Sequence, residues 1–225
     1  MSVPTITIDP PQVLTHSVRV AEVSPQDFNI RAPGPKARIA TLSKPRFPVW
    51  GDREVDVKDG NLVLPKDMTR MAVVNRYGRN TPVRVAFLEN WGKWQGSFAT
   101  TVSHDSHNLT VFGRDPADMA LAANTVRTTQ GGLCVVADGR VQTNVALPLA
   151  GLVSAAPLTD IARQFAELRQ ALDNLVEWEP PYLVFKALFG ASLVCNAGPR
   201  LSDVGLVEPF AHKTLETPLL DNPQT

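Results

Sequence analysis

The sequence predicts an α+β protein, with mixed β-sheets, a few packed amphipathic helices and a strand-rich first half. Three observations lead to this class. Short segments rich in β-branched residues succeed one another through the first half of the chain. Two later segments carry apolar residues at helical spacing, and an Asp-Gly pair between two apolar runs indicates a hairpin. Strands that dominate early and alternate with helices late are typical of α+β proteins.

Length and composition favour one ordinary folded domain. The chain has 225 residues, of which 44% are apolar, and a chain of this length buries roughly 70% of its unfolded surface. We expect a single domain over residues 1–225, in which residues 1–15 form an N-terminal linker and residues 211–225 a C-terminal tail.

Charge and hydropathy exclude several kinds of partner. The 22 Lys and Arg balance the 22 Asp and Glu, so no net field attracts nucleic acid or an acidic membrane. No apolar run approaches the ~20 residues that span a bilayer, and the N-terminus lacks the features of a secretory signal. We expect a cytoplasmic protein.

Cys134 and Cys195 each lie in an apolar run, which predicts reduced thiols in the core.

Strands are expected at four places in the first 90 residues. Prolines interrupt the first 70 residues, and because proline fixes φ and cannot donate to a ladder, we expect only short strands there. Alternating apolar residues predict two of them at 16–23 and 36–42. Residues 70–76 and 83–90 are rich in β-branched residues and too short for helices, which indicates buried strands.

A polar cluster, SHDSHN, occupies Ser103 to Asn108 and holds two of the four histidines of the chain. An apolar strand-like run, 97–102, precedes it, and a second one, 109–113, follows it. We therefore expect the cluster on the connection between two core strands.

The clearest helix follows this cluster. Asp115 is suited to cap it and Pro116 to open it, while Gly131 and Gly132 end it. Its apolar residues are spaced i, i+3, i+4 and i+7, at Met119, Ala122, Ala123 and Val126.

A hairpin and a second helix complete the expected elements. The hairpin turns at Asp138 and Gly139, which tolerate the positive φ of a tight turn. The second helix is expected over residues 159–175, with one apolar face made of Ile161, Phe165, Leu168 and Leu172.

Several stretches together resemble a known family. They are GSFATTVSHDSHN, DMALAANTV, GGLCVVADGRV, LPLAGLVS and LSDVGLV, with SVRVAEVSPQDFNI and MAVVNRYGR upstream. Their order and spacing resemble the C-terminal domain of bacterial and archaeal adenine deaminases. The resemblance covers roughly residues 15 to 210.

The resemblance implies hydrolytic deamination of adenine to hypoxanthine and ammonia by an amidohydrolase-type enzyme. In that family a (β/α)₈ barrel, N-terminal to this domain, holds a two-metal centre that activates water. We expect this divalent pair, Fe, Mn or Zn, in a barrel partner. This chain should bind no cofactor of its own, because it has no H-x-H pair and because His16 and His212 lack companion ligands. The chain alone should not be catalytic.

The resemblance leaves two accounts of the chain's role. We favour a non-metal subunit that docks onto a barrel subunit in a hetero-oligomer, since the chain begins close to where the family's domain begins; an excised domain of a longer enzyme is the other form. The alternative is a non-catalytic binding or assembly module that retains the fold. Tyr77 stands in NRYG where many family members carry histidine, which leaves the substrate open between adenine and a related heterocyclic amine or amide.

The polar cluster is the candidate site. His104, Asp105 and His107 are the candidate catalytic residues, because they can bond to a purine or move a proton. The candidate substrate-binding residues are Ser106, Asn108, Tyr77 and Trp94. Alternatively, these side chains only cap strand ends and bond their own backbone. A metal held by His104 and His107 alone would lack a closed ligand shell.

Aromatic residues offer two further hypotheses. We expect Trp50, Trp91, Trp94 and Phe98 to anchor the core or an interface, with purine stacking as the alternative. Around the Pro-Pro break of VEWEPPYLVFKALFG, a docking surface is expected from Trp178, Tyr182 and Phe185.

Overall fold

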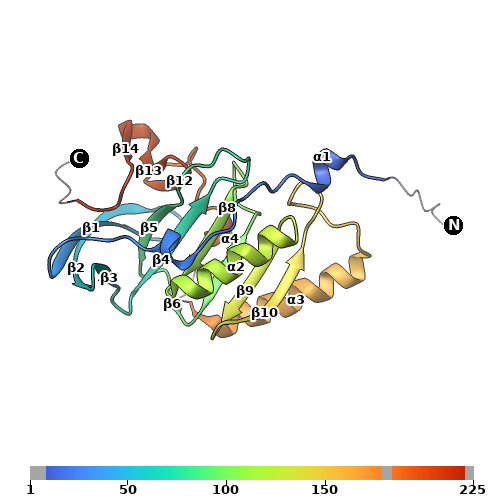
Figure 1. The fold of residues 1–225 in the computed structure, drawn as a ribbon, viewed down its shortest axis with the longest axis horizontal. Helices are drawn as coiled ribbons and strands as arrows, with labels where there is room; N and C mark the ends of the chain where they lie inside the picture. The colour runs from blue at the N-terminus through green and yellow to red at the C-terminus, as the bar shows by residue number, and fades with distance from the viewer. Residues whose placement is uncertain (1–8, 179–183, 221–225) are drawn as a thin grey trace.

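A nine-stranded mixed sheet forms the centre of the structure, a computed structural model that describes residues 9–178 and 184–220. In chain order its strands are β1 (Lys36–Ser43), β2 (Val49–Lys58), β3 (Asn61–Val63), β4 (Met68–Val74), β5 (Arg84–Glu89), β7 (Ser97–Thr100), β8 (Leu109–Gly113), β9 (Gly132–Ala137) and β10 (Arg140–Ala146). Their order across the sheet is β10-β9-β7-β8-β4-β5-β1-β2-β3 (Figure 1).

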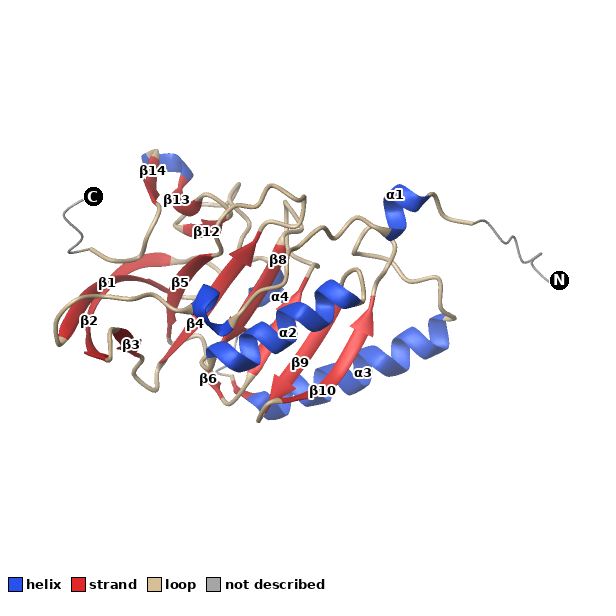
Figure 2. Ribbon diagram, in the orientation of Figure 1, coloured by secondary structure: helices blue, strands red, loops and turns tan. Residues whose placement is uncertain are grey.

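Smaller elements surround this sheet. The helices are α1 (Gln12–Thr15), η1 (Pro25–Phe28), α2 (Pro116–Thr128), α3 (Leu158–Leu175), α4 (Val184–Phe189) and η2 (Pro209–Ala211). The remaining strands are β6 (Lys93–Trp94), β11 (Val176–Glu177), β12 (Arg200–Ser202), β13 (Gly205–Glu208) and β14 (Lys213–Leu215). β6 pairs with β11. β12, β13 and β14 form a sheet of their own (Figure 2). Within the described ranges, no helix is both long and apolar enough to cross a bilayer.

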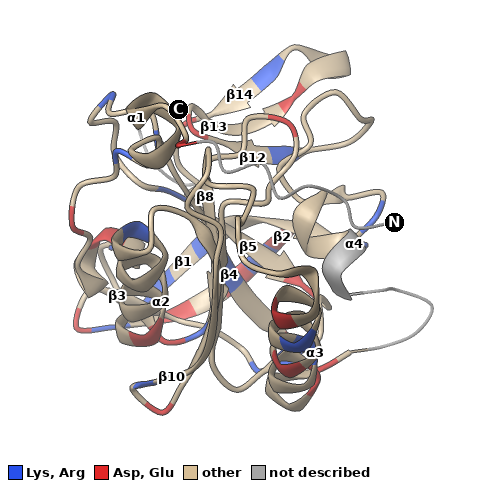
Figure 3. Ribbon diagram, turned by 90° about the vertical axis from the view of Figure 1, so that its right-hand side faces the viewer, with Lys and Arg blue, Asp and Glu red and all other residues tan. Residues whose placement is uncertain are grey.

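The two longer helices lie on opposite faces of the large sheet, as the edge-on view shows (Figure 3). α2 packs on the face that carries Ala72, Val111 and Cys134. α3 packs on the other face, against Phe98 and Leu133. Because the side chains of a strand alternate between its two faces, the central strands are apolar on both. This layered sheet with packed helices confirms the α+β prediction.

Both predicted helices and the hairpin are confirmed. The Asp115 carboxylate accepts a hydrogen bond of 2.7 Å from the main-chain N–H of Ala117 and caps α2. Past its end, Gly132 has a φ of +134° and lies so close to Val145 that a Cβ would meet the Val145 carbonyl at 2.0 Å. Asp138 and Gly139 turn the hairpin with φ values of 52° and 69°. Local sequence thus specifies this part of the fold.

The strand predicted at 16–23 is wrong. These residues form only an isolated bridge, between Arg19 and Tyr77. The alternating pattern does identify the buried side of the segment, because its residues Val18 and Val20 are buried. The segment crosses the α2 face of the sheet, so no strand edge is available to it. The side chain of Asn124 on α2 bonds both the N–H and the carbonyl of Val23, at 3.1 and 2.7 Å.

Two other expectations about the chain are also corrected. β1 and β2, of 8 and 10 residues, are not short, because the prolines flank these strands and do not interrupt them. Cys195 is exposed, whereas Cys134 is buried as expected. Cys195 lies in an irregular segment after α4, in which Ala191 is buried but Cys195 and Asn196 are exposed.

The last described residues are part of the fold. β14 pairs with β13, and the chain then returns to β1. The N–H of Ala40 donates to the carbonyl of Pro218 at 2.7 Å, and the N–H of Leu220 donates to the carbonyl of Arg38 at 2.9 Å. Residues 213–220 therefore extend the hydrogen bonding of the sheet.

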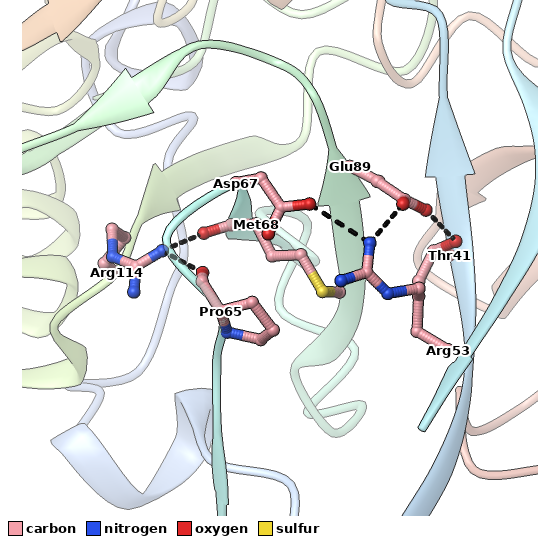
Figure 4. A network of polar contacts seen from close by, with 7 residues as sticks. All are labelled: Thr41, Arg53, Pro65, Asp67, Met68, Glu89 and Arg114. Atoms are coloured by element: carbon pink, nitrogen blue, oxygen red, sulfur yellow. Dashed lines mark hydrogen bonds and ion pairs between the residues drawn. The ribbon is translucent and has the colours of Figure 1, made fainter. Parts of the chain in front are cut away.

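Arginines secure the end of the sheet where β4 begins (Figure 4). Arg53 on β2 joins the carboxylates of Asp67 and Glu89, and Glu89 also accepts a hydrogen bond of 3.0 Å from the Thr41 hydroxyl. The guanidinium of Arg114 donates to three main-chain carbonyls of the preceding loop, those of Leu64, Pro65 and Met68. This end is closed by structural contacts, and the opposite end carries the polar cluster.

Candidate functional site

The polar cluster lies on the connection between β7 and β8, as predicted, and these strands are antiparallel neighbours. Two further loops meet it at this end of the sheet. The loop after β4, residues 75–80, contacts it through Tyr77 and Arg76. The segment after α4 contacts it through Ser192, whose hydroxyl donates to the main-chain carbonyl of His104 at 2.9 Å. The carbonyl of Phe189, the last residue of α4, accepts a hydrogen bond of 3.0 Å from the N–H of His104. We call residues 75–80, 103–108 and 190–196 together the polar end.

A chain of buried hydroxyls holds the cluster in place. The Thr110 hydroxyl donates to Ser103 at 2.7 Å, and Ser103 contacts Ser192 at 2.6 Å. The Ser192 hydroxyl donates to the main-chain carbonyl of His104 at 2.9 Å. Because each hydroxyl has one proton, Ser103 is the donor to Ser192. All three hydroxyl residues are buried, so the chain fixes the start of the loop.

The three candidate catalytic residues share one small surface. His104 and Asp105 are exposed and His107 is half-buried. The two imidazole rings meet edge to face, with centroids 5.5 Å apart. Burial, then the charges of Arg76 and His104, lower the pKa of His107 below its ordinary value. His107 is therefore neutral at pH 7 and can either accept or donate a hydrogen bond.

Three candidate substrate-binding residues also reach the polar end. The Tyr77 hydroxyl donates to the main-chain carbonyl of Ser106. Asn108 is 2% exposed, and its side-chain oxygen accepts a hydrogen bond of 3.2 Å from the N–H of Arg76. Tyr77 is 41% exposed and so offers its ring to solvent. Asn108 supports the loop, whereas Tyr77 and Ser106 are accessible to a ligand.

Trp94 is not brought to the cluster. It lies on β6, ahead of β7, whereas the cluster follows β7. Its ring is 4% exposed and stacks on Phe112 with centroids 6.0 Å apart, and its N–H donates to the Trp91 carbonyl. Trp94 is thus part of the hydrophobic core. Of the expected docking aromatics, Trp178 packs against that core as well, Tyr182 lies outside the described residues, and the side chain of Phe185 is not described.

Three residues of the polar end were not anticipated from the sequence. Ser192 completes the hydroxyl chain. Arg76 is 5% exposed and contacts two other loops. Cys195 hydrogen-bonds with the Asp105 carboxylate, which raises the pKa of its thiol. No local pattern marks any of the three, because each acquires its role from contacts with distant segments.

The chemistry of the polar end does not suit a metal. Throughout residues 9–178 and 184–220, no three His, Cys, Asp or Glu side chains gather closely enough to hold an ion. His104 and His107 thus have no third ligand in the described part of the chain. These residues of the described part of the chain do not fit a two-metal centre.

Fold and site together define a mixed α/β domain that presents polar loops at one end of its sheet. Residues 48–212 match the family model described as the adenine deaminase C-terminal domain. The chain belongs to this family.

Named relatives support this assignment. The chain is 52% identical over 209 residues to adenine deaminase 2 of Rhizobium meliloti, a match that covers 92% of the chain and 35% of the relative. It is 43% identical over 210 residues to the adenine deaminase of Klebsiella pneumoniae subsp. pneumoniae, covering 91% of the chain and 34% of the relative. The chain therefore spans about a third of the length of these relatives.

Proposed function

We propose that this chain is the non-metal part of an adenine deaminase-like amidohydrolase, which completes the active site of a barrel partner. The main support for this proposal is the polar end. Five chemistry-bearing residues from two loops share one surface: Tyr77, His104, Asp105, Ser106 and His107. A buried hydroxyl chain fixes the start of the cluster loop, and the Tyr77 hydroxyl bonds the same loop, as is needed for groups that position a substrate.

The proposed reaction consumes adenine, or a related heterocyclic amine, and one water. Water adds to the ring carbon that bears the amine, and ammonia leaves. A divalent metal pair in the barrel, Fe, Mn or Zn, would activate the water. Neutral His107 and the exposed Ser106 would bond to ring nitrogens, while His104 or Asp105 would pass a proton to the departing amine.

A groove beside the polar end supports the barrel as partner. It has a volume of about 410 Å³ and is lined mainly by apolar residues, including Val102, Leu152, Val153, Leu158, Ile161 and Phe165. Val102 directly precedes the cluster, and Val153 and Leu158 are 55% and 83% exposed. Exposed apolar side chains gathered beside a groove are typical of surfaces that a partner covers. The matched region is 35% of the Rhizobium meliloti relative, so about two thirds of that relative lies outside it. We propose that a barrel corresponding to this remaining portion covers the groove.

Reconstitution tests the proposal. The chain is co-expressed with the portion of the Rhizobium meliloti relative that it does not span, and ammonia release from adenine and other aminopurines is measured. We expect a complex that contains metal and turns over. The chain alone should be folded, metal-free and inactive; turnover by the chain alone would contradict the proposal.

Variants of the polar end test its role within that complex. His104→Ala, Asp105→Ala and His107→Ala should lower turnover by ~10²-fold or more, while folding and association stay nearly intact. His212→Ala is the matched control, because His212 is exposed in the C-terminal part of the chain. Normal turnover in all three variants would leave only the assembly role, to which the apolar groove also points.

A further inference from the structure

Arg76, a residue of the polar end, links the loop after β4 to two other segments. Its guanidinium donates to the carbonyl of Ala150 at 2.9 Å, and its main-chain N–H donates to Asn108. The same guanidinium lies 5.3 Å from the centre of the Tyr77 ring. Arg76 therefore contacts the cluster loop, its own loop and the 149–153 turn.

The burial of Arg76 is costly and needs an explanation. The residue is 5% exposed, and its Nε is buried without a hydrogen-bond partner. Among the described residues, no carboxylate forms an ion pair with it. A buried cation without a counter-charge costs several kcal/mol. An apolar residue would fill the same space at a lower cost, so stability alone does not account for Arg76.

The backbone makes room for this one side chain. Gly151 has a φ of +71°, and a Cβ there would meet Nη1 of Arg76 at 2.2 Å. The Gly151 carbonyl accepts a hydrogen bond of 2.6 Å from the buried Thr101, which fixes the turn to the end of β7. The guanidinium thus fits against a fixed, glycine-lined wall.

We propose that Arg76 is the positioning residue of the polar end, which holds the Tyr77 ring, and with it the cluster loop that the Tyr77 hydroxyl contacts, in the arrangement that the substrate meets. The role toward a substrate rests on the proposed function, whereas the contacts of Arg76 are all within this chain. Arg76, His104 and Asp105 are the charged or titratable groups that face His107, and the charge of Arg76 contributes to the lowered pKa of His107. The Tyr77 ring stacks against the guanidinium while its hydroxyl bonds the cluster loop.

Two variants separate the charge of Arg76 from its position. Arg76→Met removes the charge and keeps the length of the side chain. Gly151→Ala keeps Arg76 but displaces its guanidinium, because the new Cβ would clash with Nη1, which lies at the flexible end of the Arg76 side chain. The control for the first is Arg79→Met, exposed in the same loop. The control for the second is Gly139→Ala, whose φ of +69° imposes similar strain although no atom lies within 4 Å of the new Cβ.

NMR on the isolated chain decides the matter. In Arg76→Met we expect the pKa of His107 to rise and the ring signals of Tyr77 to shift. In Gly151→Ala we expect both sets of ring signals to shift, while neither control changes them. Unchanged His107 and Tyr77 signals in folded Arg76→Met would overturn the proposal. Should that variant not fold, Arg76→Lys replaces it, since it keeps the charge but not the planar fork, and Tyr77 must then shift.

The outcome is independent of the proposed function. If the NMR signals move but the reconstituted complex releases no ammonia, the positioning role stands and the deaminase role fails. If the complex is active while the NMR signals do not move, the deaminase role stands and the positioning role of Arg76 fails. In an active complex, Arg76→Met should lower kcat by ~10-fold or more.

Discussion

The hydroxyl of Ser192 donates a hydrogen bond of 2.9 Å to the main-chain carbonyl of His104, a residue 88 positions earlier in the chain. It is the last link of the chain that begins at Thr110 and passes through Ser103. A segment late in the sequence thus fixes the loop of the candidate site. No sequence pattern predicts that the segment of Ser192 meets the loop of His104.

Breaking this link should destabilise the protein. In Ser192→Ala the His104 carbonyl and the Ser103 hydroxyl both lose a buried partner, which should cost about 1–3 kcal/mol of the free energy of unfolding. Urea denaturation measures it. Ser106→Ala, exposed on the same loop, is the control and should change stability by less than about 0.5 kcal/mol. Equal stability of the two variants would refute the hydroxyl chain.

His107 should make stability fall in mild acid. Its pKa is lowered in the folded state by burial and by Arg76 and His104, whereas the unfolded chain has the ordinary value of about 6.5. Between these two values the unfolded state binds more protons, so stability decreases as pH falls from about 6.5 through the folded-state pKa. We expect wild type to lose more stability than His107→Gln between about pH 7.5 and about pH 5. Parallel losses in urea titrations would contradict this.

The two thiols should react very differently. Burial raises the pKa of Cys134 to about 12, so alkylation of Cys134 should require unfolding. Cys195 is exposed and should react in the native state, but slowly, since its hydrogen bond with Asp105 raises its pKa. Asp105→Asn should lower that pKa and speed native-state alkylation, as followed by mass spectrometry. Cys195→Ser provides the control, and any native-state labelling that it retains would show that Cys134 is accessible.

Arg114 should contribute strongly to stability. Arg114→Met leaves the main-chain carbonyls of Leu64, Pro65 and Met68 without their charged donor; Figure 4 shows the bonds to Pro65 and Met68. Hydrogen bonds to charged groups contribute about 1.5–3 kcal/mol each, so we expect a loss of at least 2 kcal/mol by urea unfolding. Arg140→Met, at the exposed hairpin, is the matched control. A loss no larger than that of the control would show that solvent replaces these bonds.

Local sequence determined the elements whose signals lie within a few residues. Asp115 and Pro116 begin α2, and the hairpin turns at Asp138 and Gly139, because caps and tight turns depend on the backbone preferences of the residues that form them. The placement of the polar cluster between two strands followed from the same local patterns.

Only the tertiary structure decided what each segment meets. Alternation correctly placed Val18 and Val20 on a buried face, but Asn124 on α2, and not a strand, supplies the hydrogen bonds to this segment. An apolar run predicted a buried Cys195, yet its side chain is exposed. Periodicity encodes which side of a segment is apolar and carries no information about its neighbour.

The candidate site shows the same division. The residues of SHDSHN were identifiable because they are consecutive, and their chemistry follows from their type. Arg76 and Ser192, which hold them, and Trp94, which does not join them, could not be assigned in this way. The sequence therefore determined the chemical groups of the polar end, whereas long-range packing decided which of them are held together, because such contacts join segments far apart in the chain.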